Sequence, residues 1–206
     1  MLRNLCVGLL AVSLVAVGAR VARADDAKTI DADGFFKSWL VIAGIPLPDG
    51  VSSGDAVDKE IVQEEAKLAP KAGDKVKVGE VEYTWKTLTC GEHYLDFNKF
   101  LGDIKENAVA YAVVTFTADA EVKDAVLKIG SDDGMKAYLN GKEIGKQTDD
   151  RALDKDQNSF EKLTLAKGKN TLVLKVTNSG QDFSACARFV DAEGKPIRGL
   201  TVEAAK

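Results

Sequence analysis

Histidine and cysteine are scarce in this chain, whose 206 residues include one histidine and three cysteines. A single histidine, His93, cannot supply the ligands of a histidine-rich zinc centre. It would also have to be the base of any catalytic triad that uses histidine. His93 follows Cys90 by three residues in a segment with no oxyanion signature, which disfavours a nucleophile–base pair of these two residues. We therefore expect a protein that is not an enzyme.

Long apolar runs are lacking after the first 24 residues. Residues 5–17 form an apolar run that follows Arg3 and precedes Ala22-Arg23-Ala24, which fits a small-residue cleavage site, so the arrangement is that of a signal peptide. The run is shorter than the roughly 20 residues that a transmembrane helix needs. We expect residues 1–24 to be a signal peptide, the mature chain to be exported, and no segment to span the membrane.

Basic residues do not dominate the chain. Lysine and arginine number 28 against 32 acidic residues, which gives a formal charge of -4. Cleavage after residue 24 would remove three arginines and no acidic residue, so the charge of the mature chain would be -7. An acidic protein is a poor candidate for binding nucleic acid or an anionic membrane. It is better suited to binding cations.

Two cysteines, Cys90 and Cys186, would remain after cleavage. An even number of cysteines in an exported protein permits a disulfide. The bridge would close a loop of about 100 residues and contribute up to about 4–5 kcal/mol by restricting the unfolded chain. The alternative is a pair of reduced thiols in the core.

The distribution of strand and turn signals predicts one domain over residues 25–206. Residues 25–75 lack regular alternation, and the spacing within 58–68 favours a short helix. From residue 76 onward, short alternating or β-branched segments are separated by glycine, asparagine and aspartate turns. We expect an all-β fold, with an irregular or short-helical lead-in at 25–75 and a core β-sandwich at 76–202.

The most informative segment is residues 129–142, with the sequence IGSDDGMKAYLNGK. Asn140-Gly141 between alternating strands predicts a β-hairpin with a type I′ turn, because both central residues of that turn need positive φ. Two adjacent carboxylates, Asp132 and Asp133, precede the hairpin at a loop end. Their hard oxygen atoms are within reach of one cation.

This segment resembles jelly-roll modules of the galactose-binding-like superfamily, in particular PA14-like modules and the sugar-binding domains appended to bacterial glycoside hydrolases. The glycine-x-asparagine turn at 168–170 and the aromatic and proline segment at 36–48 fit the same pattern. The resemblance covers most of residues 35–202. It implies a jelly-roll β-sandwich that serves as an exported, non-catalytic carbohydrate-binding or adhesion-type module.

The resemblance also implies a calcium site. PA14-like adhesins use adjacent aspartates, sometimes joined by a cis peptide, to hold calcium that binds sugar hydroxyls, and Asp132 and Asp133 are the matching positions. Asp133 would then also contact the ligand. Calcium takes about six to eight oxygen ligands, so two carboxylates alone do not complete its shell. The alternative is a loop whose carboxylates accept hydrogen bonds from nearby backbone amides.

Aromatic side chains are the other candidates for glycan binding, because sugar rings stack on flat apolar surfaces. Tyr138 and Trp85 are the candidate platforms. Tyr138 should face away from Met135, Ala137 and Leu139 if the strand alternates. The alternative is that both rings pack against a second layer. The expected partner is a polysaccharide or glycan. The alternative function is that of a cell-envelope structural or protein-interaction module that shares only the fold, and its partner would be a cell-envelope protein.

Overall fold

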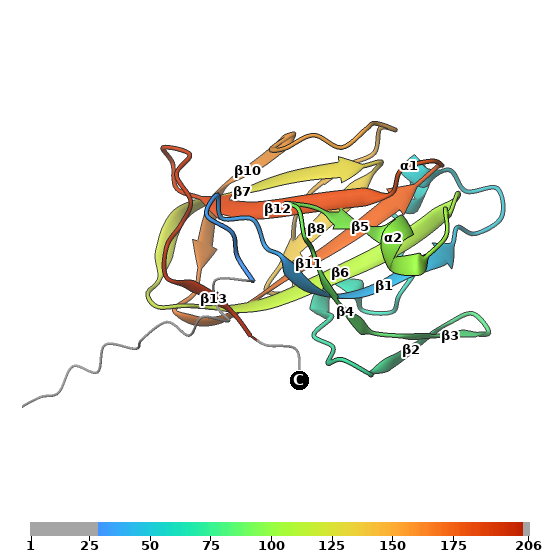
Figure 1. Ribbon diagram of the computed structural model, residues 1–206, viewed down its shortest axis with the longest axis horizontal. Helices are drawn as coiled ribbons and strands as arrows, with labels where there is room; N and C mark the ends of the chain where they lie inside the picture. Colours follow the sequence, from blue (N-terminus) through green and yellow to red (C-terminus); the bar gives the residue numbers. More distant parts are fainter. Residues whose placement is uncertain (1–28, 204–206) are drawn as a thin grey trace, which may run out of the picture.

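The computed structural model describes residues 29–203, which form two facing β-sheets (Figure 1). The expected signal peptide, residues 1–24, lies outside the described residues. Within residues 29–203, no helix has the length and apolar character needed to cross a membrane. The predicted all-β sandwich is confirmed.

The larger sheet has the strand order β4-β1-β6-β11-β8-β9, and β13 also pairs with β6. Its two longest strands, β6 and β11, lie side by side at its centre and are antiparallel. Its members are β1 (Ser38–Pro46), β4 (Lys86–Thr89), β6 (Ala108–Ala118), β8 (Met135–Leu139), β9 (Lys142–Gln147), β11 (Gly168–Asn178) and β13 (Leu200–Val202).

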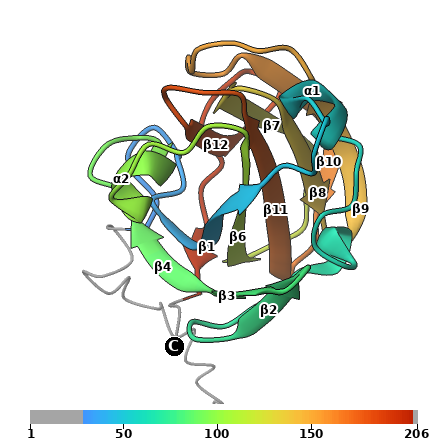
Figure 2. The same ribbon diagram turned by 90° about the vertical axis from the view of Figure 1, so that its right-hand side faces the viewer.

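The smaller sheet has the order β10-β7-β12-β5, again antiparallel. It consists of β5 (Leu95–Asp96), β7 (Val122–Asp132), β10 (Asn158–Leu165) and β12 (Ser184–Val190). A separate hairpin, β2 (Lys75–Val78) and β3 (Val81–Thr84), lies beside the larger sheet (Figure 2). The helical elements are short: α1 (Ser53–Ala56), the 3₁₀ turn η2 (Glu65–Lys67) and α2 (Phe97–Leu101).

The Asn140-Gly141 hairpin forms as predicted between β8 and β9. Asn140 has φ of 52° and Gly141 has φ of 82°, so both central residues adopt the positive values that the turn requires. The Asn140 side chain also accepts a hydrogen bond from the amide of Thr171 at 2.9 Å. The turn is thereby fixed to the neighbouring strand β11.

The principal core lies between the two sheets. In β12 the alternation of side chains is clear, since Ala185, Ala187 and Phe189 pack into this core while Cys186 and Arg188 occupy the opposite face. The central strands β6 and β11 are buried on both faces. This is why their sequences read as nearly continuous apolar runs.

A second apolar cluster covers the outer face of the larger sheet, the face turned away from the smaller one. Tyr111, Val113 and Val173 of the sheet pack there with Val62 and Trp85. Val62 belongs to a covering segment, residues 51–74, which we call the strap. The strap and the β2–β3 hairpin thus form a third layer over a face that a simple two-layer sandwich would expose to water.

The lead-in predicted at 25–75 is less irregular than expected. It contains β1, which lies inside the larger sheet between β4 and β6. The prediction is therefore wrong over residues 38–46. The reason is that β1 is covered on both faces, with Trp39 in the principal core and Ile42 in the second cluster, so its sequence does not alternate.

The short helix expected over 58–68 is also not formed. The structure instead has α1 before this segment and η2 near its end, and Glu64 adopts a left-handed conformation with φ of 54°. The carbonyl oxygens of Val57 and Lys59 accept hydrogen bonds from the ammonium of Lys175. Contacts to the sheet therefore outweigh the local helical preference of the strap.

Lys175 and Glu65 form a buried ion pair beneath the strap, with Nζ and Oε2 3.2 Å apart. The hydroxyl of Tyr138 donates to Glu65 Oε1 at 2.6 Å, and the hydroxyl of Tyr111 donates to Glu65 Oε2. Burial lowers the pKa of Lys175 and raises the pKa of Tyr111. The charges are stable there because nearly all of their hydrogen-bonding capacity is used within the network.

Lys175→Met should lower the free energy of unfolding by about 3–5 kcal/mol, because it leaves the carboxylate of Glu65 buried without its counter-charge. The double variant Glu65→Gln/Lys175→Met removes both charges and should recover much of that loss. Urea denaturation at neutral pH measures both values. A double variant no more stable than Lys175→Met would show that the unpaired charge is not the cause.

Candidate functional site

Three loops meet at the end of the smaller sheet that lies near α1 and α2 (Figure 1). Asp133, in the β7–β8 loop, joins them. Its Oδ1 accepts a hydrogen bond from the amide of Arg151 at 2.8 Å, and its Oδ2 accepts from the amide and the hydroxyl of Ser179 at 2.8 and 2.6 Å. Asp133 is only 5% exposed, and the peptide bond that precedes it is cis. The carboxylate of Asp133 therefore links these loops to one another.

Arg151 fixes the β9–β10 loop, residues 148–157, against the same junction. Its guanidinium donates to the carbonyl and hydroxyl oxygens of Ser131 at 3.2 and 2.8 Å, and to Asn158 at 2.6 Å. This loop crosses the outer face of the smaller sheet at Gly130. A Cβ atom on Gly130 would lie 1.9 Å from the carbonyl oxygen of Asp154. The close approach of the loop thus depends on glycine at this position.

A groove of about 890 Å³ opens beside the junction. The strand register places Asp132, Ser184 and Asp96 in one row across β7, β12 and β5, since Ser184 pairs with both aspartates. Directly paired residues point to the same face of a sheet, and all three line the groove. Ser184 is 7% exposed, and its hydroxyl is not among the buried polar atoms of residues 29–203 that lack a hydrogen-bond partner. The row of these three residues makes the floor of the groove polar.

Asp132 differs electrostatically from its neighbour Asp133. It is 6% exposed and lines the groove. Burial, followed by the charges of Asp133 and Asp182, raises the pKa of Asp132 to about 6, although the amide of Leu153 opposes the rise. Asp132 is thus a carboxylate that would gain from a cationic or hydrogen-bond-donating ligand.

The calcium site expected at Asp132 and Asp133 stays a prediction, and the peptide bond between the two aspartates is cis. The Asp133 oxygens already accept hydrogen bonds from Arg151 and Ser179, which matches the alternative of a loop carboxylate bound to nearby amides. Among the described residues, no three side chains of His, Cys, Asp or Glu are grouped so that they could hold a metal ion.

The two aromatic platforms expected from the sequence do not lie in the groove. Tyr138 does face away from Met135, Ala137 and Leu139, as predicted, but it is 6% exposed and lies under the strap. Trp85 is 2% exposed in the same second cluster. Neither ring has a face free for a sugar, because the third layer covers both.

Three aromatic residues line the groove: His93, Tyr94 and Phe183. Phe183 is 1% exposed and packs on Phe97. His93 and Tyr94 are half-buried, and their ring centroids are 5.3 Å apart in an edge-to-face arrangement. Burial, followed by the charge of Lys155, lowers the pKa of His93, so its ring is neutral at neutral pH. The sequence gives one indication that Tyr94 belongs to the groove. Tyr94 lies two residues before Asp96 in an alternating segment, so the two side chains share one face of the strand.

The disulfide considered between Cys90 and Cys186 is not formed, and both residues are buried free thiols. Cys90 packs into the principal core, whereas Cys186 lies on the outer face of β12 beneath the β9–β10 loop. The two side chains therefore occupy opposite faces of the smaller sheet. Burial raises the pKa of Cys90 to about 12 and of Cys186 to about 11, which keeps both thiols protonated and unreactive.

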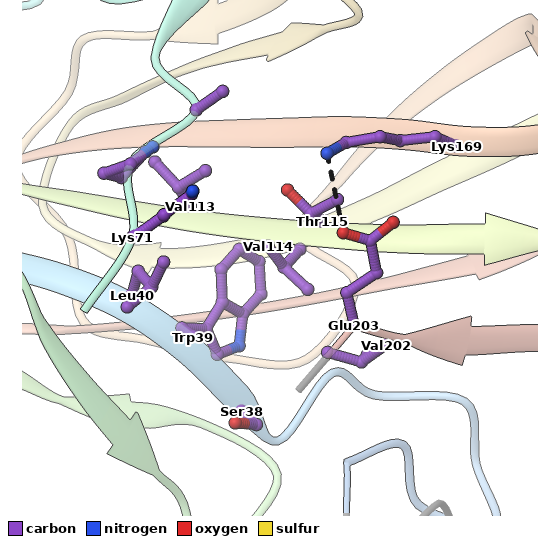
Figure 3. Close-up of a pocket in the computed structure, with 12 residues that line it drawn as sticks. Ser38, Trp39, Leu40, Lys71, Val113, Val114, Thr115, Lys169, Val202 and Glu203 are labelled. Atoms are coloured by element: carbon purple, nitrogen blue, oxygen red, sulfur yellow. Dashed lines mark ion pairs between the residues drawn. The ribbon is translucent and has the colours of Figure 1, made fainter. Parts of the chain in front are cut away.

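A second hollow of about 350 Å³ lies over the outer face of the larger sheet (Figure 3). Leu40 and Val113 contribute an apolar floor, and Lys71 of the strap lies on one side. An ion pair between Lys169 and Glu203, 3.5 Å apart, lies on the other. This hollow lacks the row of buried polar atoms that marks the groove beside Asp132.

No protein-family model matches the chain, and no curated protein matches it. Among solved structures, the PA14 domain of the antifreeze protein MpAFP is similar at 10% identity and a TM-score of 0.36. The likeness covers 48% of this chain and 53% of that one, so this chain spans about half the length of the MpAFP chain. A family 35 carbohydrate-binding module from an environmental isolate is similar at 13% identity and a TM-score of 0.37, over 71% of this chain and 98% of that module.

A β-glucuronidase from an uncultured Clostridium species is similar at 11% identity and a TM-score of 0.43, over 79% of this chain and 30% of the enzyme.

The pKa of Asp132 makes stability depend on pH in a defined direction. Its folded value of about 6 exceeds the ordinary 3.8, so the folded protein binds this proton more tightly than the unfolded chain does. The contribution of Asp132 to stability should therefore fall as pH rises from about 4 to about 6, whereas the lowered pKa of His93 acts in the opposite direction. Asp132→Asn should abolish that fall and stabilise the protein by about 1–3 kcal/mol at neutral pH. Thermal unfolding across this range in a chelating buffer tests both points; equal melting temperatures at neutral pH would contradict them.

Gly130→Ala should displace the β9–β10 loop and lower the free energy of unfolding by about 1–3 kcal/mol, because its methyl group overlaps a backbone oxygen. Gly91→Ala is the matched control, since a Cβ atom there meets no atom within 4 Å. Denaturation gives the stabilities, and amide exchange over residues 148–157 reports the loop. Unchanged protection of the loop in Gly130→Ala would refute the predicted displacement.

Proposed function

We propose that this protein is an exported, non-catalytic carbohydrate-binding module and that the groove beside Asp132 holds the glycan. The observation that carries the proposal is the row of Asp132, Ser184 and Asp96 on the groove floor, with the ring of Tyr94 also lining the groove. Sugars combine hydroxyl groups with apolar ring faces, so they need polar atoms next to an aromatic surface.

The dimensions of the groove support the same assignment. Its volume of about 890 Å³ lies within the range of about 300–1,000 Å³ that is usual for small-molecule sites. Its walls come from loops that are held by Asp133 and Arg151, so the floor and walls are largely formed before a ligand binds. A preformed site loses less conformational entropy on binding.

The contacts of the candidate catalytic residues support a binding role rather than catalysis. His93 makes ring contacts with Phe35 and Tyr94, and within residues 29–203 it forms no hydrogen bond to a hydroxyl or thiol. A histidine base needs such a contact with its nucleophile. The thiols of Cys90 and Cys186 are protonated and buried. Export is proposed from the sequence of residues 1–24.

Two exposed apolar side chains favour a second candidate function, a protein-interaction module. Ile104, which lines the groove, is 64% exposed, and Val81, in the β2–β3 hairpin, is 52% exposed. Exposed apolar residues grouped in a patch mark protein contacts, but these two lie on different elements. The groove, which gathers polar and aromatic groups at one place, is the stronger feature.

Screening against plant, algal and bacterial glycans, with and without chelator, tests the proposal. Tyr94→Ala should weaken binding of the best glycan about tenfold or more, equivalent to about 1.4 kcal/mol, because it removes the stacking surface. Tyr83→Ala, an aromatic substitution in the hairpin, should bind like the wild type. Calorimetry measures both affinities. No glycan bound in either condition, or a release of sugar products by the wild type, would overturn the assignment.

A further inference from the structure

We infer that Ile104 is a specificity-determining residue of the groove and that it favours glycans whose sugars carry an N-acetyl group, which rests on the proposed function and specifies its ligand class. Ile104 is an aliphatic side chain that a hydrogen-bonded loop presents to solvent at the lining of the groove. The floor of the same groove carries hydrogen-bond acceptors.

Ile104 is one of two large apolar side chains that are exposed within residues 29–203. It is 64% exposed, whereas the other, Val81, lies in the β2–β3 hairpin outside the groove. Single exposed apolar residues are common on protein surfaces and need no explanation by themselves. Ile104 differs in its position, because it lies in the α2–β6 loop and lines the groove together with the ring of Tyr94.

The backbone of the α2–β6 loop is fixed on both sides of Ile104. The amide of Asp103 donates to the carbonyl of Asn98 at 3.2 Å, and the amide of Lys105 donates to Asn98 Oδ1 at 3.1 Å. The carbonyl of Lys105 accepts a hydrogen bond of 2.7 Å from the buried side chain of Asn178. The exposure of Ile104 therefore follows from a backbone whose hydrogen bonds are made within the fold.

Asn98 also connects the α2–β6 loop to the β11–β12 loop. Its Nδ2 donates to the carbonyl of Gln181 at 2.7 Å, and both residues line the groove. Ser179 of the β11–β12 loop donates to the carboxylate of Asp133 at the loop junction. The loop that carries Ile104 is thus linked to the other walls of the groove, and a preformed contact costs less conformational entropy on binding.

An aliphatic side chain contacts a different part of a sugar than an aromatic ring does. Sugar rings stack on a flat aromatic surface, which Tyr94 supplies, whereas the branched side chain of Ile104 has no flat face. Such a side chain can bury a methyl group instead. Burying one carbon of this kind raises affinity about fourfold.

An N-acetyl group matches both features of the groove. Its methyl group is apolar, and its amide N–H can donate to the carboxylates of Asp132 and Asp96 on the floor. Each carboxylate already accepts one backbone amide, from Leu153 and Lys99 respectively, and it keeps acceptor capacity because a carboxylate has about four lone-pair sites. The N-acetyl group is neutral, so these carboxylates do not repel it. A hydroxyl at the same position supplies a donor but no methyl group.

Calorimetry at neutral pH with length-matched β-1,4-linked oligomers of N-acetylglucosamine and of glucose tests this selectivity. We expect the wild type to bind the N-acetylated oligomer at least about fourfold more tightly. Ile104→Ser should lower that preference by about fourfold and change the affinity for the glucose oligomer less than about twofold. Val81→Ser removes the other exposed apolar side chain and should keep the preference of the wild type.

Equal affinities for the two oligomers, tighter binding of the glucose oligomer, or an unchanged preference in Ile104→Ser would refute the role of Ile104 while carbohydrate binding stands. Binding of neither oligomer refutes it as well, if the glycan screen finds another ligand. If the screen is also negative, the proposed function fails too. Ile104 is exposed, so Ile104→Ser should fold like the wild type, which thermal unfolding checks.

Discussion

The hydrogen bonds accepted by Asp133 hold the functional end of the molecule together. One buried carboxylate joins the β7–β8 loop to the β9–β10 loop through Arg151 and to the β11–β12 loop through Ser179. Each of the two loops is held to the Asp133 carboxylate by at least one hydrogen bond of 2.8 Å or shorter. The walls of the groove depend on this junction, since both neighbouring loops line it.

The adjacent aspartates therefore divide two tasks between them. Asp132 is the last residue of β7, so the strand register directs it to the face shared with Ser184 and Asp96. Asp133 lies beyond the strand and turns to the loop amides. The charge of Asp133 is, after burial, the second cause that raises the pKa of Asp132. That charge prepares the groove floor for a cation or a strong donor.

Local sequence rules predicted the parts of the structure that depend on local physics. The turn at Asn140 and Gly141 could be predicted from those two residues alone, because both favour positive φ. Strand alternation placed Tyr138 on the correct face of the sheet. Local sequence rules could not show that the strap covers the face on which Tyr138 lies. The strap is held by Lys175, which is more than 100 residues away from it in the sequence. The partners of Asp133 were out of reach for the same reason: Arg151 and Ser179 become neighbours only when the sheets form.

The layering of the fold explains why the groove lies at a loop end. The strap closes most of the outer face of the larger sheet, and the inner faces of both sheets form the principal core. The outer face of the smaller sheet is also covered in part, since the β9–β10 loop crosses it at Gly130 and Arg188 there binds Asp156 and the carbonyl of Asp33. Strand β10 stays exposed on that face, at Ser159 and Glu161. The groove at Asp132, Ser184 and Asp96 lies where the loops rise beside the end of the sheet, so the loops and not the exposed strand give this face its one deep hollow among the described residues.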